Sequence, residues 1–122
     1  MRGRQHNTRW QRVLALAAVV AMAATAGCGK GTERRQISAA VVDGKPGFTP
    51  ASLSVHTGDK VVLVVRNTTD KTHGFSIEGY GVSKVVSTSQ PLRVRFTASK
   101  PGVFKIFCQL HPTHQTATLR VG

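Results

Sequence analysis

The sequence predicts an all-β protein: a small antiparallel β-sandwich of about seven strands that follows an export signal. From Ile37 onward no helical period of apolar residues persists, and short β-branched runs alternate with turn residues instead. Seven such runs with turns at close intervals are typical of two packed sheets. A chain of 122 residues leaves no room for a second full domain.

Residues 1–27 are expected to be a signal peptide. Residues 1–12 carry four arginines and no acid, and residues 13–26 form an uncharged, Ala-rich run. A basic start, a short apolar run and small residues at its end are typical of an export signal. The run is shorter than the ~20 apolar residues of a membrane-spanning helix. His6 would leave with the signal.

Two ways of processing this signal remain open. The small-residue triplet that ends at Ala26 fits cleavage after that residue, which would give a secreted protein. The tetrapeptide TAGC that ends at Cys28 resembles a bacterial lipobox, in which Cys28 receives diacylglycerol and becomes the new N-terminus. We favour lipidation of Cys28, because a lone cysteine at the start of an exported chain is otherwise hard to place. Residues 28–36 would then form a linker between a membrane anchor and the folded domain, residues 37–122.

Turn residues and alternation define the first three expected strands. Asp43-Gly44 and a Pro46-Gly47 turn close the first strand. The second strand alternates apolar and polar residues, and Gly58-Asp59 turns the chain into the third. The VVLVV run of the third suggests a strand covered on both faces. These strands are Ile37–Val42, Ser52–His56 and Lys60–Asn67.

Four further strands complete the expected sandwich, and a loop rich in Gly and Ser separates the first of them from the rest. These strands are His73–Ile77, Leu92–Ala98, Gly102–Cys108 and Gln115–Val121, and the loop lies between Glu78 and Pro91. The expected core consists of Phe48, Leu53, Val55, Val62, Val64, Phe75, Val94, Phe96, Phe104 and Ile106. His56 falls on the polar face of its strand and is expected to be exposed.

The formal charge of +12 suggests nucleic acid, an anionic membrane surface or an acidic partner. Removal of residues 1–27 takes away four arginines and no acids, which leaves 13 basic and 5 acidic residues. Lys30, Arg34 and Arg35 would lie beside the anchor, near anionic headgroups. The other basic residues are scattered singly along strands and turns, which favours solvated surface. An exported protein meets little nucleic acid, so no nucleic-acid binding is expected.

The stretch that carries chemistry is Cys108-x-x-His111-x-x-His114, at the end of an expected strand. His73 stands at the start of another strand, thirty-five residues upstream of the cysteine. A thiolate and imidazoles spaced three residues apart can converge on one ion. One thiolate with two imidazoles is the ligand set of blue-copper electron-transfer sites, which add a weak axial ligand. His114 is the candidate for that fourth position, and the alternative is that it points to solvent.

At these positions the sequence resembles the cupredoxins over roughly residues 40–122. The resemblance implies a Greek-key sandwich in which His73, Cys108 and His111 are the in-plane ligands of copper. The loop has the length of the short amicyanin-type loop. The His-Gly-Phe motif is similar to the copper domains of nitrous oxide reductase and cytochrome oxidase subunit II, but their second loop cysteine is absent, so one copper ion is expected. The motifs are Phe48-Thr49-Pro50, Gly58-Asp59-Lys60-Val61, Asn67, His73-Gly74-Phe75, Lys100-Pro101-Gly102-Val103-Phe104 and Cys108-x-x-His111.

The sequence departs from this family at two positions. Many blue-copper proteins place Asn after the first histidine, where it braces the cysteine loop, and here that residue is Gly74. The axial methionine is replaced by His114, a harder and stronger donor that favours cupric over cuprous copper. The resemblance then implies a lower potential and absorption moved from blue toward green or red, as in nitrosocyanin-like red copper proteins. If His114 instead points to solvent, the site is three-coordinate or takes water.

The functional hypothesis is an extracytoplasmic, membrane-anchored mononuclear cupredoxin that passes one electron between redox partner proteins. His111 would be the exit for the electron, and Leu110, Pro112 and Thr113 would form an apolar docking patch around it. Three alternatives stay open. They are a copper carrier or buffer that hands copper to an accepting protein, a structural zinc site with one cysteine and three histidine ligands, and a red-copper enzyme with an open position for a small molecule.

Other interpretations of the same residues are less favoured. A disulfide between Cys28 and Cys108 would consume the ligand, and lipidation of Cys28 excludes it. A catalytic cysteine–histidine dyad lacks an orienting group or oxyanion element nearby. Glu78 and Tyr80 follow His73 closely enough to approach the site, although loop surface is the simpler interpretation.

Overall fold

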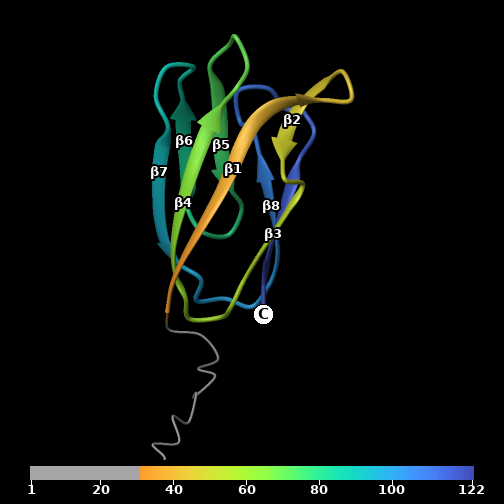
Figure 1. Ribbon diagram of the computed structural model, residues 1–122. Coiled ribbons are helices and arrows are strands. Elements are labelled where there is room, and N and C mark those ends of the chain that lie inside the picture. Colours follow the sequence, from red (N-terminus) through yellow and green to blue (C-terminus); the bar gives the residue numbers. More distant parts are fainter. Residues whose placement is uncertain (1–30) are drawn as a thin grey trace, which may run out of the picture.

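Nine strands form two sheets that pack face to face in the computed structural model, which describes residues 31–122 (Figure 1). The four-stranded sheet has the order β2-β1-β4-β7, and the five-stranded sheet has the order β3-β9-β8-β5-β6. The strands are β1 (Thr32–Val42), β2 (Lys45–Thr49), β3 (Ser52–Val55), β4 (Lys60–Asn67), β5 (His73–Ile77), β6 (Val82–Val86), β7 (Leu92–Thr97), β8 (Gly102–Phe107) and β9 (Ala117–Val121). The expected β-sandwich is confirmed.

The sheets are mixed rather than wholly antiparallel, which corrects the expectation. β1 pairs with β4 in parallel, and β3 pairs with β9 in parallel, whereas the remaining pairs are antiparallel. Parallel neighbours require a crossover between them. The chain supplies it by passing between the sheets, because β1 and β2 belong to one sheet and β3 to the other.

Two strands were not expected, and both lie at sheet edges. Asp43 and Gly44, with φ values of 52° and 76°, make a tight turn that pairs Val42 with Lys45 and starts β2. Pro46 therefore lies in a strand, where an edge position tolerates its missing N–H. β6 occupies part of the expected loop between Glu78 and Pro91, and its valines pair with β5.

The first strand begins five residues earlier than expected. Residues 32–36, assigned to the linker, pair in parallel with the first half of β4, from Thr32 opposite Lys60 to Gln36 opposite Val64. These five residues are polar, so they show no apolar pattern from which a strand could be predicted. Only the second half of β1 contributes apolar side chains to the core. The expected signal peptide and Cys28 lie outside the described residues.

The core lies between the two sheets, and six of the ten expected core residues are buried in it: Phe48, Leu53, Val55, Phe75, Val94 and Ile106. Phe96 and Phe104 pack against its margin. The expectation for β4 was wrong by one residue, since Val61, Leu63 and Val65 face the core and Val62 and Val64 alternate to the outer face.

The sheet topology places the start of β5 and the end of β8 at the same end of the sandwich. These neighbouring strands are antiparallel, with Ser76 opposite Phe107 and Ile77 opposite Ile106. The first residue of β5 is His73, and the residue that follows β8 is Cys108. Within residues 31–122, no helix has the length and hydropathy needed to cross a bilayer.

Candidate metal centre

Four side chains converge at this end of the five-stranded sheet. His73, Cys108, His111 and His114 each offer one ligand atom, and these four atoms all lie within 4.8 Å of one another. After β8 the chain makes two successive turns, in which the His111 N–H donates to the Cys108 carbonyl at 3.2 Å and the His114 N–H donates to the His111 carbonyl at 3.1 Å. Each turn advances three residues, so the sequence spacing returns both imidazoles toward the thiol.

The Cys108 thiol is the buried centre of the cluster, with 2% of the residue exposed. Its Sγ lies 3.9 Å from Nδ1 of His73 and 3.5 Å from Nδ1 of His111, and it accepts the backbone N–H of Gly74 at 3.2 Å. A thiolate and an imidazole on one ion, with bonds of about 2.3 and 2.0 Å, lie about 3.5–3.7 Å apart for tetrahedral to trigonal angles. The observed separations therefore suit two ligands of a single ion.

His114 closes the cluster on its other side. Its ring stacks on the His111 ring, with centroids 4.5 Å apart and planes at 22°, and its centroid lies 5.0 Å from that of His73. Its Nδ1 is buried and has no hydrogen-bond partner among the described residues. A buried polar atom without a partner costs free energy, and a metal ion would satisfy it. The donor set of one thiol and three imidazoles is compatible with one copper ion.

The surroundings of the cluster lower the pKa of two of its imidazoles, those of His73 and His114. Burial lowers the pKa of His73, and the nearby charges of His114 and His111 lower it further, while Asp70 acts in the opposite direction. Burial, and then the charge of His111, lowers the pKa of His114 as well. Neutral imidazole is the form that coordinates a metal, so both side chains are ready to bind at neutral pH.

Gln109 is a site residue that sequence reasoning missed. A Cβ at Gly74 would lie 2.3 Å from Oε1 of Gln109 and 2.5 Å from its Cδ, so the Gln109 amide fills the space above the glycine. Oε1 accepts the Ser76 hydroxyl at 2.7 Å, and Nε2 donates to the Lys84 carbonyl at 2.8 Å. The loop that carries Cys108, His111 and His114 is thus tied to β5 and β6 by the side chain of Gln109, and not by a side chain at position 74. The only sequence signal for this arrangement was Gly74 itself, which leaves space that another side chain can fill.

A cavity of about 240 Å³ opens beside the three imidazoles, and Val41, Asp70 and Lys71 contribute to its wall. The expected docking residues Leu110, Pro112 and Thr113 are exposed on the adjacent loop, Leu110 to 48%. His111 is half-buried between this surface and the thiol.

The remaining candidate residues lie away from the centre. His56 is exposed, as expected, and groups with Glu33 and Asp59 at the other end of the sandwich. In that group Arg35 already pairs with Glu33, and Asp59 accepts the His56 backbone N–H at 2.9 Å. Tyr80 does not approach the centre, since its ring packs on Phe96 and Phe104.

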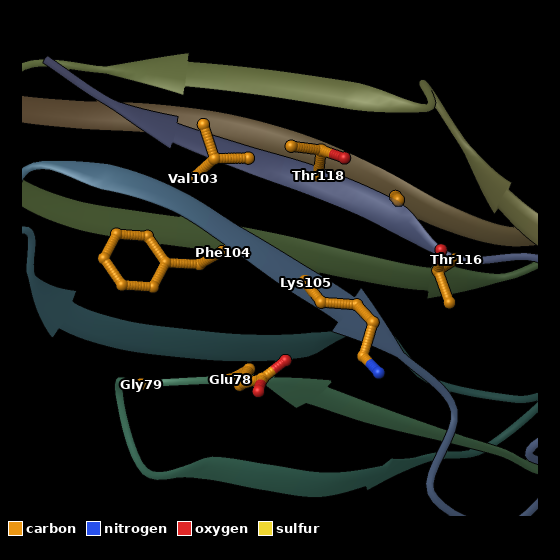
Figure 2. A pocket seen from close by; sticks show the side chains of 8 residues that line it. Glu78, Gly79, Val103, Phe104, Lys105, Thr116 and Thr118 are labelled. Carbon is orange, nitrogen blue, oxygen red and sulfur yellow. The ribbon is translucent and has the colours of Figure 1, made fainter.

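Glu78 lines a different hollow, on the outer face of the five-stranded sheet. Figure 2 shows Glu78 near Lys105, with Val103 and Thr118 farther across the sheet. The hollow has a volume of about 570 Å³ and includes no cysteine or histidine in its lining, so it is not the metal centre. Cys108 forms no disulfide with the described residues.

Residues 13–121 match the family described as the cupredoxin-like domain. The chain is 34% identical over 77 residues to the nitrous-oxide reductase of Cupriavidus necator, covering 61% of this chain and 12% of that protein. It is 31% identical over 62 residues to cytochrome c oxidase subunit 2 of Thermus thermophilus, covering 51% of this chain and 45% of that protein. The chain thus spans less than half the length of these relatives.

Two solved structures illustrate the likeness of fold. Auracyanin A, a "blue" copper protein from Chloroflexus aurantiacus, superposes with a TM-score of 0.61 at 14% identity, over 75% of this chain and 100% of that one. The copper nitrite reductase of Nitrosomonas europaea superposes with a TM-score of 0.63 at 17% identity, over 74% of this chain and 41% of that one. At these identities the likeness establishes the architecture of the two sheets.

Proposed function

Because this chain belongs to the cupredoxin-like domain family, we propose that it is an extracytoplasmic mononuclear copper protein that passes single electrons between redox partners. We further propose that lipid on Cys28 holds it at the membrane. The observation that carries the function is the convergence of one buried thiol and three imidazoles within 4.8 Å. That donor set joins a soft thiolate to borderline nitrogen ligands, the combination that copper sites use for electron transfer.

We assign His73, Cys108 and His111 as the principal ligands and His114 as the fourth. Copper bound there would supply a one-electron couple. The chain holds the ligands in place: the Gly74 N–H donates to the thiolate, and β5 and the two turns after β8 fix the imidazoles. Ligands held by buried strands and short turns reorganise little when the charge of the site changes, which is the protein's contribution to fast transfer.

The third imidazole distinguishes this site from a thioether-ligated one. Imidazole is a harder donor than methionine sulfur, so His114 stabilises the cupric more than the cuprous ion and lowers the potential. We therefore expect a protein that accepts electrons from low-potential donors and absorbs toward green or red.

Electrons would enter and leave through the exposed loop. His111 links the thiol to the surface, and Leu110, Pro112 and Thr113 surround it with an uncharged, exposed rim. Similarity to nitrous-oxide reductase, cytochrome c oxidase subunit 2 and the periplasmic domain of a cytochrome oxidase subunit II supports a redox role outside the cytoplasm. The chain covers 12% of the first of these relatives, and we propose no reductase activity for it.

Two observations favour alternative uses of the same ligands. The unpartnered buried nitrogen of His114 would strengthen cupric binding, which suits a copper carrier or buffer. The sulfur–nitrogen separations of 3.9 and 3.5 Å also suit a tetrahedral structural zinc site.

Metal analysis of protein expressed in the periplasm, followed by repeated oxidation and reduction, separates these functions. Electron transfer predicts one copper per chain, an intense visible band and copper retained through successive cycles. Loss of copper on reduction would instead identify a carrier, and zinc with no visible band would identify a structural site.

A further inference from the structure

The outer face of the four-stranded sheet collects basic residues that are far apart in the sequence. In register across β1, β4 and β7, Arg34 lies opposite Val62, which lies opposite Arg95. Two residues further along β4, Val64 lies opposite Arg93 of β7, and two residues beyond that β4 carries Arg66. Lys60 begins the same face of β4. We call Arg34, Lys60, Arg66, Arg93 and Arg95 the basic face.

Glu33 is the only acidic residue in the four strands of this sheet. Side chains alternate along a strand, so Glu33 points to the opposite side of β1 from the basic face. On that side it pairs with Arg35. Within residues 31–122, no carboxylate forms an ion pair with any residue of the basic face. The five cations are all exposed. Outward residues two apart on a strand are about 6.6 Å apart and neighbouring strands about 4.8 Å apart, so the five cations gather on one patch of the sheet, with Val62 and Val64 between them.

The basic face combines groups that bind phosphate with apolar side chains that can contact an apolar surface. Four of its five cations are arginines, whose planar guanidinium groups bind phosphate oxygens in pairs. Between them, Val62 is only 9% exposed although it points out of the sandwich, because long side chains on either side cover it. At the Lys60 end, a hollow of about 370 Å³ lies between that lysine and Arg95.

We propose that the basic face lies on the surface of a bilayer that contains anionic phospholipid. The unpaired positive charge of this exposed sheet face is complementary to an extended anionic surface, and each basic residue near such a surface adds to the binding. β1 starts at Thr32, four residues after the cysteine that we expect to carry lipid, so the tether and the face would act on the same membrane.

This orientation has a consequence for the metal centre. Figure 1 shows β1, β4 and β7 side by side, with the other sheet behind them. His73 starts β5 and Cys108 follows β8, both strands of the five-stranded sheet, so a bilayer against the basic face leaves the loop that carries Cys108, His111 and His114 free for protein partners. The membrane contact does not depend on copper, and its test is independent of the test of electron transfer.

The test uses the chain from residue 28 onward with Cys28→Ala, which keeps every described strand and removes the lipid. Binding to phosphatidylcholine vesicles with and without phosphatidylglycerol is measured by co-sedimentation, for metal-free and copper-loaded protein. The double variant Arg34→Gln/Arg95→Gln keeps most of each apolar stem. Lys105→Gln/Arg120→Gln, on the other sheet, is the matched control with the same change in net charge.

We expect binding only to vesicles with phosphatidylglycerol, equal for both metal states and lost at high salt. Neutralising one arginine should weaken it about fivefold, so the first variant should bind about 25-fold more weakly and the control within about twofold of the parent. Equal losses in both variants, or no preference for anionic vesicles, would overturn the proposal. Binding to duplex DNA or a polyglutamate peptide without binding to vesicles would overturn it as well.

Discussion

The side-chain amide of Gln109 occupies the space in which a side chain at position 74 would lie, since a Cβ on Gly74 would come within 2.3 Å of its Oε1. The same amide bonds to the Ser76 hydroxyl and to the Lys84 carbonyl, and Gln109 directly follows Cys108, which we assign as a ligand. The absence of a side chain at Gly74 therefore makes room for the Gln109 amide, which fixes the loop that carries Cys108, His111 and His114 on the sheet.

This relationship predicts that substitutions at the two positions are coupled. Gly74→Ala should destabilise the metal-free protein by about 1–3 kcal/mol, because the added methyl group displaces a packed amide. In a Gln109→Ala background the same substitution should cost less, because the side-chain amide is gone and only the backbone nitrogen of residue 109, at 3.0 Å, still crowds the added methyl group. Denaturant unfolding of both single variants and the double variant measures the coupling. Gly31→Ala, where nothing lies within 4 Å, is the control. Equal penalties at position 74 in both backgrounds would show that the amide does not hold the loop.

The two adjacent residues Leu63 and Val64 should respond differently to truncation. Leu63 is 1% exposed and faces the core, whereas Val64 lies half-buried on the outer face. Leu63→Ala should lower the free energy of unfolding by about 2–5 kcal/mol through lost burial and a residual cavity. Val64→Ala should cost less than half as much. Thermal unfolding of both variants tests which side chains of β4 face the core. A larger loss of stability in Val64→Ala than in Leu63→Ala would contradict the observed orientation of β4.

Acid should destabilise the metal-free protein. The folded pKa values of His73 and His114 lie below their ordinary value of 6.5, so the unfolded chain takes up protons first as the pH falls. The stability associated with neutral imidazoles is therefore complete above pH 6.5 and lost as the pH falls through 6.5 toward the folded values. His114→Asn should flatten the decline of Tm between pH 7 and 5. An unchanged decline in the His114 variant would contradict the assigned cause.

His114→Met should move the absorption of the copper-loaded protein toward blue and raise its reduction potential, because a thioether favours cuprous copper more than imidazole does. A tenfold change in the relative affinity for the two oxidation states shifts a one-electron potential by about 59 mV, which voltammetry resolves. If spectrum and potential both stay unchanged, His114 is not a ligand.

The convergence of one cysteine and three histidines could be anticipated from sequence because its geometry is mostly local. Cys108, His111 and His114 are joined by two three-residue turns, and only His73 must be brought in by the sheet. The orientation of β4 could not be anticipated in the same way. Its run of five apolar residues shows no alternation, so the identity of the core face depends on pairing with β1 and β7.

Contacts between distant segments account for the other differences. The basic residues are scattered in the sequence, and only the register of three strands collects them on one face. Gln109 likewise acquires its role from Gly74 and Lys84, twenty-five or more residues away. β2 and β6 are edge strands with few buried residues, so their patterns carry little of the core signal.

The most direct test of the central claim, that the Cys108 thiolate binds the metal, is the visible absorption spectrum of the copper-loaded protein compared with that of Cys108→Ser. The substitution keeps the size of the side chain and the three imidazoles but removes the sulfur from which charge transfer to copper arises. We predict an intense visible band in the parent and none in the variant. A band of equal intensity in the variant would show that the metal does not bind this sulfur and would contradict the assignment of the site.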